Sequence, residues 1–368
     1  GGEGDREEGG EGGGPVRPAL RPPFPFTLSP PVAMARFIFR RFLTLIPTVF
    51  GISVLVFFMI HLIPGDPAEM MLGERASEES LQELRSQLGL DQPLYVQYGL
   101  FLSRLVRGDL GRAMRTNEKI TVEIAERFPA TAELSLAAIL IATVFGMLAG
   151  IISATKQYSI FDYVSMIASL IGVSMPIFWL GLVLMIIFSL NLGWLPLSGR
   201  LSYDVTLESI THLYVVDSIL TGNWTAFKDA VWHLIMPAFT LSTIPMAIIA
   251  RITRSSMLEV LRQDYIRTAK AKGLSPLVVY FKHGLKNALI PVITVIGLQF
   301  GILMGGAILT ETIFAWPGIG SWILNAVYAR DFNAVQGGTM LVATVFVLIN
   351  MVVDILYAWV NPRIKVSG

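Results

Sequence analysis

The sequence predicts an all-α membrane protein, because the chain is unusually apolar and its apolar residues are gathered into long segments. Of its 368 residues, 53% are hydrophobic and only 15% are charged, whereas about a quarter of the residues in a typical soluble domain are charged. Crossing a bilayer as a helix takes about 20 residues. A segment in lipid must satisfy its own backbone hydrogen bonds, so apolar runs of this length are expected to be helices.

Six spanning helices are expected, and five prolines lie inside them or at their ends. The predicted spans are residues 37–63, 131–154, 165–192, 233–254, 287–309 and 338–360, and the prolines are Pro47, Pro176, Pro237, Pro245 and Pro291. Neighbouring helices in a bundle can satisfy the backbone groups that a proline leaves without a partner. The prolines therefore indicate either hinges or irregular packing, and both interpretations stay open.

The first 33 residues are expected to lie outside the fold. Residues 1–33 are dominated by Gly, Pro, Arg and Glu, a composition that cannot bury enough apolar surface to offset the entropy of ordering. They also lack the regions of a signal peptide. Because Met34 directly opens the first apolar segment, we interpret residues 1–33 as an upstream or artefactual extension, with a disordered tail as the alternative.

Basic residues gather on one side of the predicted topology. They lie before the first span, between the second and third, between the fourth and fifth, and after the last: Arg36, Arg40, Arg41, Lys156, Arg251, Arg254, Arg262, Arg267, Lys270, Lys272, Lys282, Lys286, Arg363 and Lys365. With six spans these four regions face the same side. The positive-inside rule places that side, with both termini, in the cytoplasm.

The largest segment on the opposite side, residues 64–130, is predicted to form a small helical domain. Leucines recur at helical spacing before Gly89, and a second helical stretch ends at Gly108. Glycine commonly follows the last residue of a helix, which supports both ends. Two further outer segments, residues 193–232 and 310–338, complete this side.

The sequence contains no pattern for catalysis, nucleotide binding or metal binding. It has no cysteine, no glycine-rich phosphate loop with a following lysine and no His-Glu-x-x-His motif. We therefore expect no cofactor, no metal and no nucleic acid partner. Away from the ends of the predicted spans, Asp354 is the exceptional charge. We favour an interhelix hydrogen-bond acceptor or a charge near the interface over a proton relay, and the lack of midplane carboxylates disfavours an ion-coupled carrier.

The basic segment between the fourth and fifth spans is predicted to form a hairpin on the cytoplasmic face. Residues 255–273 are expected to be one amphipathic helix, with Leu258, Leu261, Tyr265 and Ala269 at steps of three and four residues. Gly273 and the Ser-Pro pair that follows it should turn the chain, and a second helix then returns to the membrane. An ordinary interfacial helix attracted to anionic lipid is the alternative.

This segment resembles the "EAA---G---------I-LP" signature of permease subunits of binding-protein-dependent ABC importers. Ala269 matches the third position and Gly273 the glycine. Arg267 and Thr268 stand where Glu and Ala are expected, and His283 and Lys286 replace Ile and Pro, a form typical of the peptide-importer branch. Further pieces such as "GDLG", "RFPATAELS", "ETIFAWPGIGSW" and "VNPRIK" are similar to that branch, so the resemblance covers residues 34–365.

The resemblance is to the B-type permease of dipeptide and oligopeptide importers, and it implies a type I ABC importer permease fold. The domains would be a first span at 34–63, the outer domain at 64–130, and a five-helix core at 131–365 with a cytoplasmic coupling loop at 255–286. It implies a subunit that is not an enzyme and works in an inner membrane of a prokaryote. Its partners would be a homologous second permease, two ATPase subunits that bind ATP and Mg, an extracytoplasmic solute-binding protein, membrane lipid and a peptide substrate.

The resemblance also assigns roles to two sets of residues. The expected ATPase-coupling residues are Asp264, Tyr265, Arg267, Thr268, Ala269, Lys270, Ala271, Lys272 and Gly273. The expected residues for an outer gate, or for docking of the binding protein, are Glu311, Phe314, Trp316, Pro317 and Gly318. Small Ala269 and Ala271 would permit close approach of the ATPase. Alternatives are an importer of the same class for nickel, glutathione or oligosaccharide, and a stand-alone ion-coupled carrier.

Overall fold

The computed structural model describes residues 31–62, 67–72, 76–305 and 307–360, and this part of the chain is almost entirely helical. The long helices are α1 (Pro31–Leu62), α5 (Ile120–Thr155), α9 (Trp224–Leu261), α11 (Lys286–Met304) and α14 (Phe332–Val360). The shorter ones are α2 (Pro67–Leu72), α3 (Glu78–Leu88), α4 (Leu94–Val106), α6 (Ile160–Ser174), α7 (Ile177–Leu184), α8 (Tyr214–Leu220), α10 (Asp264–Ala271), α12 (Ile308–Ile313) and α13 (Ile319–Tyr328), with π-helical segments η1 (Met185–Asn191) and η2 (Val278–Leu285). The prediction for residues 1–33 falls outside the described residues, apart from the first turn of α1.

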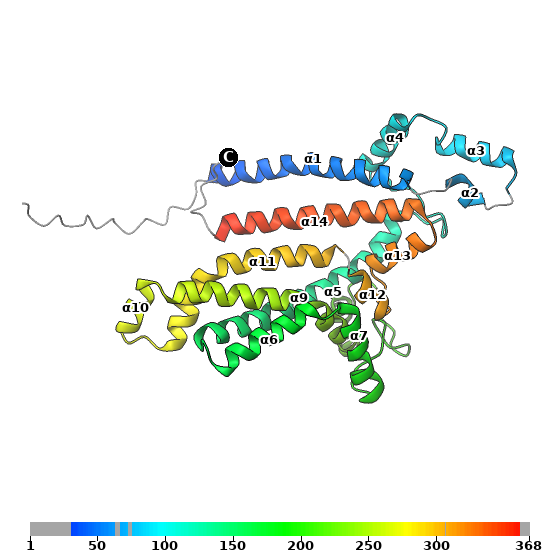
Figure 1. Ribbon diagram of the computed structural model, residues 1–368. Coiled ribbons are helices and arrows are strands. Elements are labelled where there is room, and N and C mark those ends of the chain that lie inside the picture. The colour runs from blue at the N-terminus through cyan, green and yellow to red at the C-terminus, as the bar shows by residue number, and fades with distance from the viewer. Residues whose placement is uncertain (1–30, 63–66, 73–75, 306, 361–368) are drawn as a thin grey trace, which may run out of the picture.

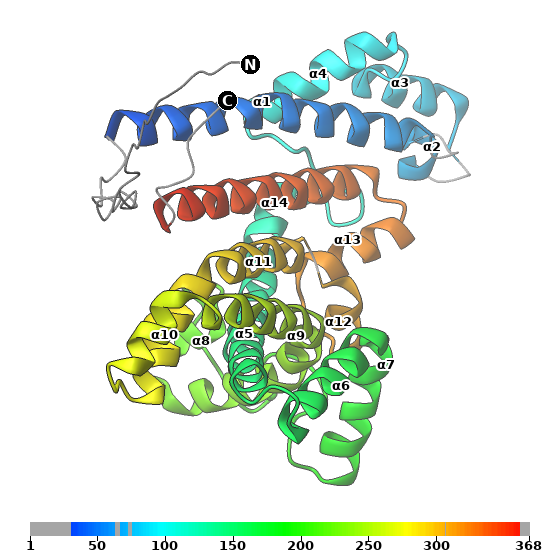
Figure 2. The same cartoon turned by 60° about the vertical axis from the view of Figure 1, so that its left-hand side comes forward.

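The long helices and α6 lie side by side in one bundle (Figure 1). In both cartoon views α1 packs on α14, α14 on α11, and α11 on the central pair α5 and α9, with α6 on the far side (Figure 2). Five helical segments of the described chain are long and apolar enough to cross a membrane, and a sixth crossing requires α6 together with α7 and η1. The prediction of an all-helical membrane protein is therefore confirmed.

The predicted third span, residues 165–192, is not one straight helix. The axis of α6 and that of α7 with η1 differ in direction by 104°. The bend lies at Met175, whose backbone is extended (ψ 129°), and at Pro176, which begins α7 as its N-cap. Proline disfavours a helical conformation in the residue before it and has no N–H to donate, so α6 ends there. Pro176 thus marks a break, whereas the other four prolines lie inside helices.

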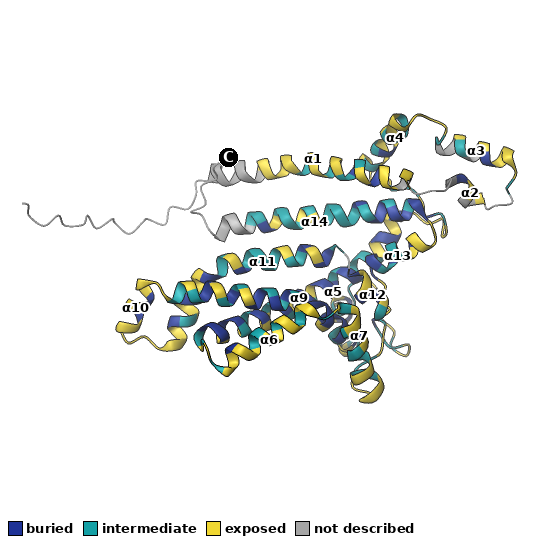
Figure 3. Ribbon diagram, viewed as in Figure 1, coloured by how far each residue is buried: buried dark blue, intermediate teal, exposed yellow. Residues whose placement is uncertain are grey.

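Close packing of α5 against α9 forms the centre of the bundle. A Cβ atom added at Gly146 would lie 2.8 Å from the backbone oxygen of Met246, and one at Gly150 would lie 2.6 Å from that of Ala250. Only glycine fits at these two positions, and small residues let membrane helices approach closely. Figure 3 shows α5 and α9 as the most buried helices of the bundle, with α1, α6 and α10 largely exposed.

Helix α1 lies at the edge of the bundle and is tied to α14 by an ion pair. The Arg41 guanidinium lies 2.8 Å from the Asp354 carboxylate. This contact confirms the prediction that Asp354 accepts a bond between helices. Nearer the other end of α1, Val56 and Phe57 pack against Phe101 of α4 and Met340 of α14.

The bundle has two different ends, which we name the α10 end and the α4 end. The α10 end holds α10, the start of α1 and the finish of α14, and the α4 end holds α2, α3 and α4 (Figure 1). Gly89 and Gly108 follow α3 and α4 in the left-handed conformation, with φ of 72° and 74°, as predicted. Helix α5 begins at Ile120, so it extends well beyond the predicted second span into the segment assigned to the outer domain.

Candidate functional site

The basic segment at the α10 end folds as a hairpin, but its first arm is shorter than the sequence predicts. Helix α9 continues to Leu261, the helical conformation is interrupted at Arg262 and Gln263, and the separate helix α10 follows. The single amphipathic helix predicted at 255–273 is therefore wrong. Gly273 lies in the left-handed conformation (φ 74°), which glycine adopts without a steric penalty. The chain then returns through η2 into α11.

A small hydrophobic core holds the hairpin together. Ile266, Ala269 and Val279 are buried against each other and contact Leu261 and Tyr280. Ala269 therefore faces the inside of the hairpin, which corrects the expectation that it lies on the contact surface. Ala271 is exposed, so of the two alanines it is the one that a partner can approach.

The charged side chains of α10 point away from that core. Arg267, Lys270 and Lys272 are exposed, and the 3.6 Å contact between Arg267 and Asp264 joins two side chains that are both largely in solvent. An ion pair of this kind contributes little to stability. These cations are therefore available to an acidic surface.

Polar contacts connect the hairpin with the bundle. The Asn287 amide donates to the Tyr265 hydroxyl at 2.8 Å, which links α10 to the start of α11. Next to the hairpin, Arg254 of α9 donates to Asp162 of α6 at 2.8 and 2.9 Å, and the Ser153 hydroxyl of α5 also donates to Asp162. Three helices of the bundle thus meet where the α10 hairpin begins. Sequence reasoning counted Arg254 only as a cytoplasmic charge and did not identify its pairing with Asp162.

At the α4 end, α12 and α13 form a second compact hairpin around the buried carboxylate of Glu311. The Thr131 hydroxyl and the Ser321 backbone N–H each donate to Glu311 at 2.7 Å. A Cβ atom at Gly318 would lie 2.4 Å from the Glu311 carboxyl carbon. Burial raises the pKa of Glu311, although the hydrogen bonds from Thr131 and Ser321 oppose that shift.

The five predicted outer residues lie together in this hairpin. Glu311, Phe314, Trp316 and Gly318 are buried, and Pro317 is exposed. The Trp316 indole donates to the backbone oxygen of Ala130 at 2.8 Å, which fastens the hairpin to α5. Of these five residues Pro317 is the exposed one, whereas the other four are packed inside the hairpin.

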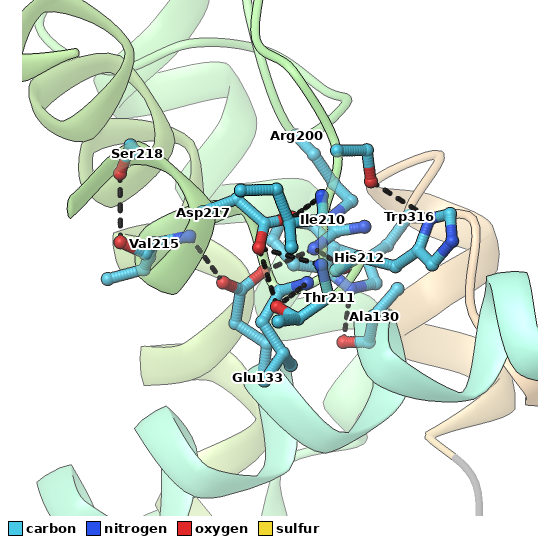
Figure 4. A network of polar contacts seen from close by, with 12 residues as sticks. Ala130, Glu133, Arg200, Ile210, Thr211, His212, Val215, Asp217, Ser218 and Trp316 are labelled. Atoms are coloured by element: carbon cyan, nitrogen blue, oxygen red, sulfur yellow. Dashed lines mark hydrogen bonds and ion pairs between the residues drawn. The ribbon is translucent and has the colours of Figure 1, made fainter. Parts of the chain in front are cut away.

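An ion pair that the sequence did not indicate lies beside Trp316 (Figure 4). The Arg200 guanidinium donates to Glu133 of α5 at 2.6 Å and to the backbone oxygen of His212 at 2.9 Å, and both charged side chains are buried. The guanidinium carbon also lies 3.6 Å from the ring centre of Tyr214 and 5.4 Å from that of Trp316. This arrangement fixes the segment between η1 and α9 against α5 and the α12–α13 hairpin.

Asp217 completes the network from the side of α8. The Thr211 hydroxyl and backbone N–H donate to Asp217 at 2.6 and 2.9 Å, and Ile210 donates its N–H at 3.2 Å. Burial raises the pKa of Asp217, but these hydrogen bonds outweigh it and hold the pKa below its ordinary value. The carboxylate therefore stays ionised at neutral pH, and the hydrogen bonds that it accepts hold the loop before α8 in place.

Two family profiles match the chain. The "Binding-protein-dependent transport system inner membrane component" profile matches residues 146–366, and the N-terminal membrane-component profile of the same transport systems matches residues 34–137. In the solved structures, an inward-facing MetNI methionine ABC transporter is similar, with a TM-score of 0.49, 17% sequence identity and coverage of 66% of this chain and 97% of that one.

Relatives match along nearly their whole length. The di/tripeptide transport system permease protein DppB of Pseudomonas aeruginosa is 55% identical over 333 residues, or 90% of this chain and 99% of that protein. The dipeptide transport system permease protein DppB of Alkalihalophilus pseudofirmus is 54% identical, with coverage of 90% and 100%. The glutathione transport system permease protein GsiC of Escherichia coli is 42% identical, with coverage of 90% and 99%.

These similarities confirm the family that the sequence motifs indicated, and with it the predictions of a transport subunit that is not an enzyme and carries no cofactor of its own. They also confirm a multi-pass protein of a bacterial inner membrane. The chain belongs to the family of inner membrane components of binding-protein-dependent transport systems.

Proposed function

We propose that the chain is a permease subunit of an ATP-driven importer that carries dipeptides across the inner membrane. The observation that carries this proposal is the similarity to dipeptide permeases, which extends over nearly the full length of those proteins. In this proposal the chain has the type I importer fold and crosses the membrane six times, with α6, α7 and η1 as one bent crossing. The α10 end faces the cytoplasm with both termini, in line with the positive-inside rule.

The α10 hairpin is the coupling element in this proposal. Its hydrophobic core makes it a compact unit, its cations are exposed, and Asn287 and Tyr265 link it to α11. A push on such a unit is transmitted to α9 and α11 as a rigid movement, which is how packed helices change between discrete arrangements. The docking surface for the ATPase subunit consists of the exposed members of the predicted set: Asp264, Tyr265, Arg267, Thr268, Lys270, Ala271, Lys272 and Gly273.

The α12–α13 hairpin serves as part of an outer gate in the same proposal. Its contacts with α5 and with the Arg200 segment make the α4 end of the chain stiff. A stiff outer element can close the path as a unit when the bundle moves. The remaining partners are a homologous second permease subunit, which completes the path, and a solute-binding protein that docks at the α4 end.

Uptake by a reconstituted complex tests the function. The chain is placed in proteoliposomes with the second permease and ATPase subunits, and labelled dipeptide is supplied with the cognate binding protein. We expect uptake that requires ATP, the ATPase subunits and the binding protein. Uptake that persists without the ATPase subunits would instead support an ion-coupled carrier.

Competition by other solutes tests the cargo. Glutathione is the second candidate, since a glutathione permease is 42% identical to the chain, and nickel and oligosaccharide serve as further competitors. We expect unlabelled dipeptide to compete best. A better competitor among the other three would keep the transport class and replace the cargo.

A further inference from the structure

We propose that a cavity at the α4 end binds an acidic side chain of the docking solute-binding protein between Arg115 and Arg127. This inference rests on the proposed function, because it assumes such a partner. The cavity has a volume of about 440 Å³ and lies where the start of α5 meets α13 and the start of α14. Its polar lining includes Arg115, Glu123, Arg127 and Asp331.

The two carboxylates that line the cavity already accept hydrogen bonds from other groups of the chain. Glu123 is buried and accepts hydrogen bonds from the Thr116 hydroxyl and from the Trp322 indole. Asp331 is buried as well and accepts from the backbone N–H groups of Met114 at 2.6 Å and Ala334 at 3.0 Å. These groups hold the 107–119 segment and the α13–α14 corner in place, so they form the structural floor of the cavity.

The two guanidinium groups of the cavity differ in this respect. Within the described part of the chain, neither the Arg115 nor the Arg127 side chain has a hydrogen-bond or ion-pair partner, and the Arg127 Nε is a buried donor without an acceptor. A buried donor that is left without an acceptor is costly. An anion that enters the cavity removes that cost, and a carboxylate matches the planar donor pattern of arginine.

The chemistry favours an acidic side chain over the peptide cargo itself. A free dipeptide carries an ammonium group besides its carboxylate, and that ammonium would need an acceptor. Glu123 and Asp331 are almost fully buried and held by hydrogen bonds from the chain, so little of either carboxylate is accessible to an ammonium, whereas the two guanidinium groups have no anionic partner. Arg115 is exposed and Arg127 partly exposed, so a side chain on a docked surface can reach both.

Docking affinity tests the inference. The complete transporter is reconstituted in nanodiscs, and binding of the fluorescently labelled, dipeptide-loaded cognate binding protein is measured for wild type, R115Q, R127Q, R127K and the control R107Q. Arg107 is exposed just after α4 and is not among the residues that line the cavity. We expect R127Q and R115Q each to weaken docking about tenfold, R127K to recover part of the loss, and R107Q to change it within about twofold.

Basal ATPase activity without the binding protein shows that each variant is assembled, and it should equal that of wild type. The inference would be overturned if R115Q and R127Q docked the binding protein with the same affinity as R107Q. It would also be overturned if R127Q weakened the binding of free dipeptide but left docking unchanged. If the wild type docks the binding protein and imports dipeptide while R127Q docks normally, only this inference fails. If the wild type does neither, the proposed function fails with it.

Discussion

The α12–α13 hairpin and the α10 hairpin use charged residues in opposite ways. At the α4 end, Glu133, Arg200 and Glu311 are buried and hydrogen-bonded to helices far apart in the sequence. At the α10 end, the charges of α10 are exposed and the hairpin is held by three apolar side chains. Buried polar groups must all be paired, which specifies one arrangement. The comparison teaches that the α12–α13 hairpin is built to keep its shape, whereas the α10 hairpin exposes its charges.

The largest expected effect comes from breaking the buried ion pair at the α4 end. Replacing either Glu133 or Arg200 with alanine leaves the other charge buried without its partner, which costs about 3–5 kcal/mol. We expect Glu133→Ala and Arg200→Ala each to lower the thermal unfolding midpoint of the purified complex strongly. The double variant should lose less than the sum of the two single losses. Additive losses would show that the two side chains do not act as a pair.

A matched pair of glycine substitutions sharpens the same contrast. Gly318→Ala places a Cβ atom 2.4 Å from a Glu311 carboxylate that Thr131 and Ser321 hold in position, and overpacking of this kind costs about 1–3 kcal/mol or more. Gly273→Ala meets nothing within 4 Å, so only its left-handed φ is strained, at about 1 kcal/mol.

Thermal unfolding and yield of the two variants measure this difference. We expect Gly318→Ala to reduce both, and Gly273→Ala to assemble well with a slightly lower midpoint. Equal losses would contradict the view that the α12–α13 hairpin is rigid and the α10 turn is open.

The sequence predicted the long helices because a long apolar run indicates a segment that can cross a bilayer. The start of α5 and both ends of α9 were wrong, because the apolar run is shorter than the helix. Helix α9 runs from Trp224 to Leu261 although the predicted span was 233–254, because the helix continues into polar residues that hydropathy assigns to loops. Whether Pro176 is a hinge stayed open in the sequence, and the 104° change of direction could not be predicted, since both arms are apolar and hydropathy carries no information about direction.

The sequence located the two candidate segments but not the orientation of their side chains. The motif located the α10 hairpin and the α12–α13 hairpin, yet Ala269 faces inward and Trp316 is buried. The spacing puts Ala269 on the apolar face of the predicted helix, but it does not show that Val279 covers Ala269 or that Trp316 packs on α5. The pairs Glu133–Arg200 and Asp162–Arg254 join residues 67 and 92 positions apart. Only the packing of the helices brings such charges together.

The smallest effect on stability, and the most informative about coupling, is expected from the exposed cations of α10. The double variant Arg267→Gln and Lys270→Gln removes charge from side chains that no core contact holds, and exposed substitutions of this kind change stability within about 0.5 kcal/mol. In the coupling proposal these cations contact the ATPase. We therefore expect the variant to keep its unfolding midpoint and to lose ATP-driven dipeptide uptake.

The ratio of uptake to ATP hydrolysis in proteoliposomes measures that loss, and Ala269→Asp is the comparison. An aspartate at position 269 buries a carboxylate beside Ile266 and Val279, so it should reduce uptake by disrupting the hairpin itself and should lower the midpoint as well. If the double variant transports normally while Ala269→Asp does not, the hairpin matters for its shape alone. The exposed charge at the α10 end would then have no role in coupling.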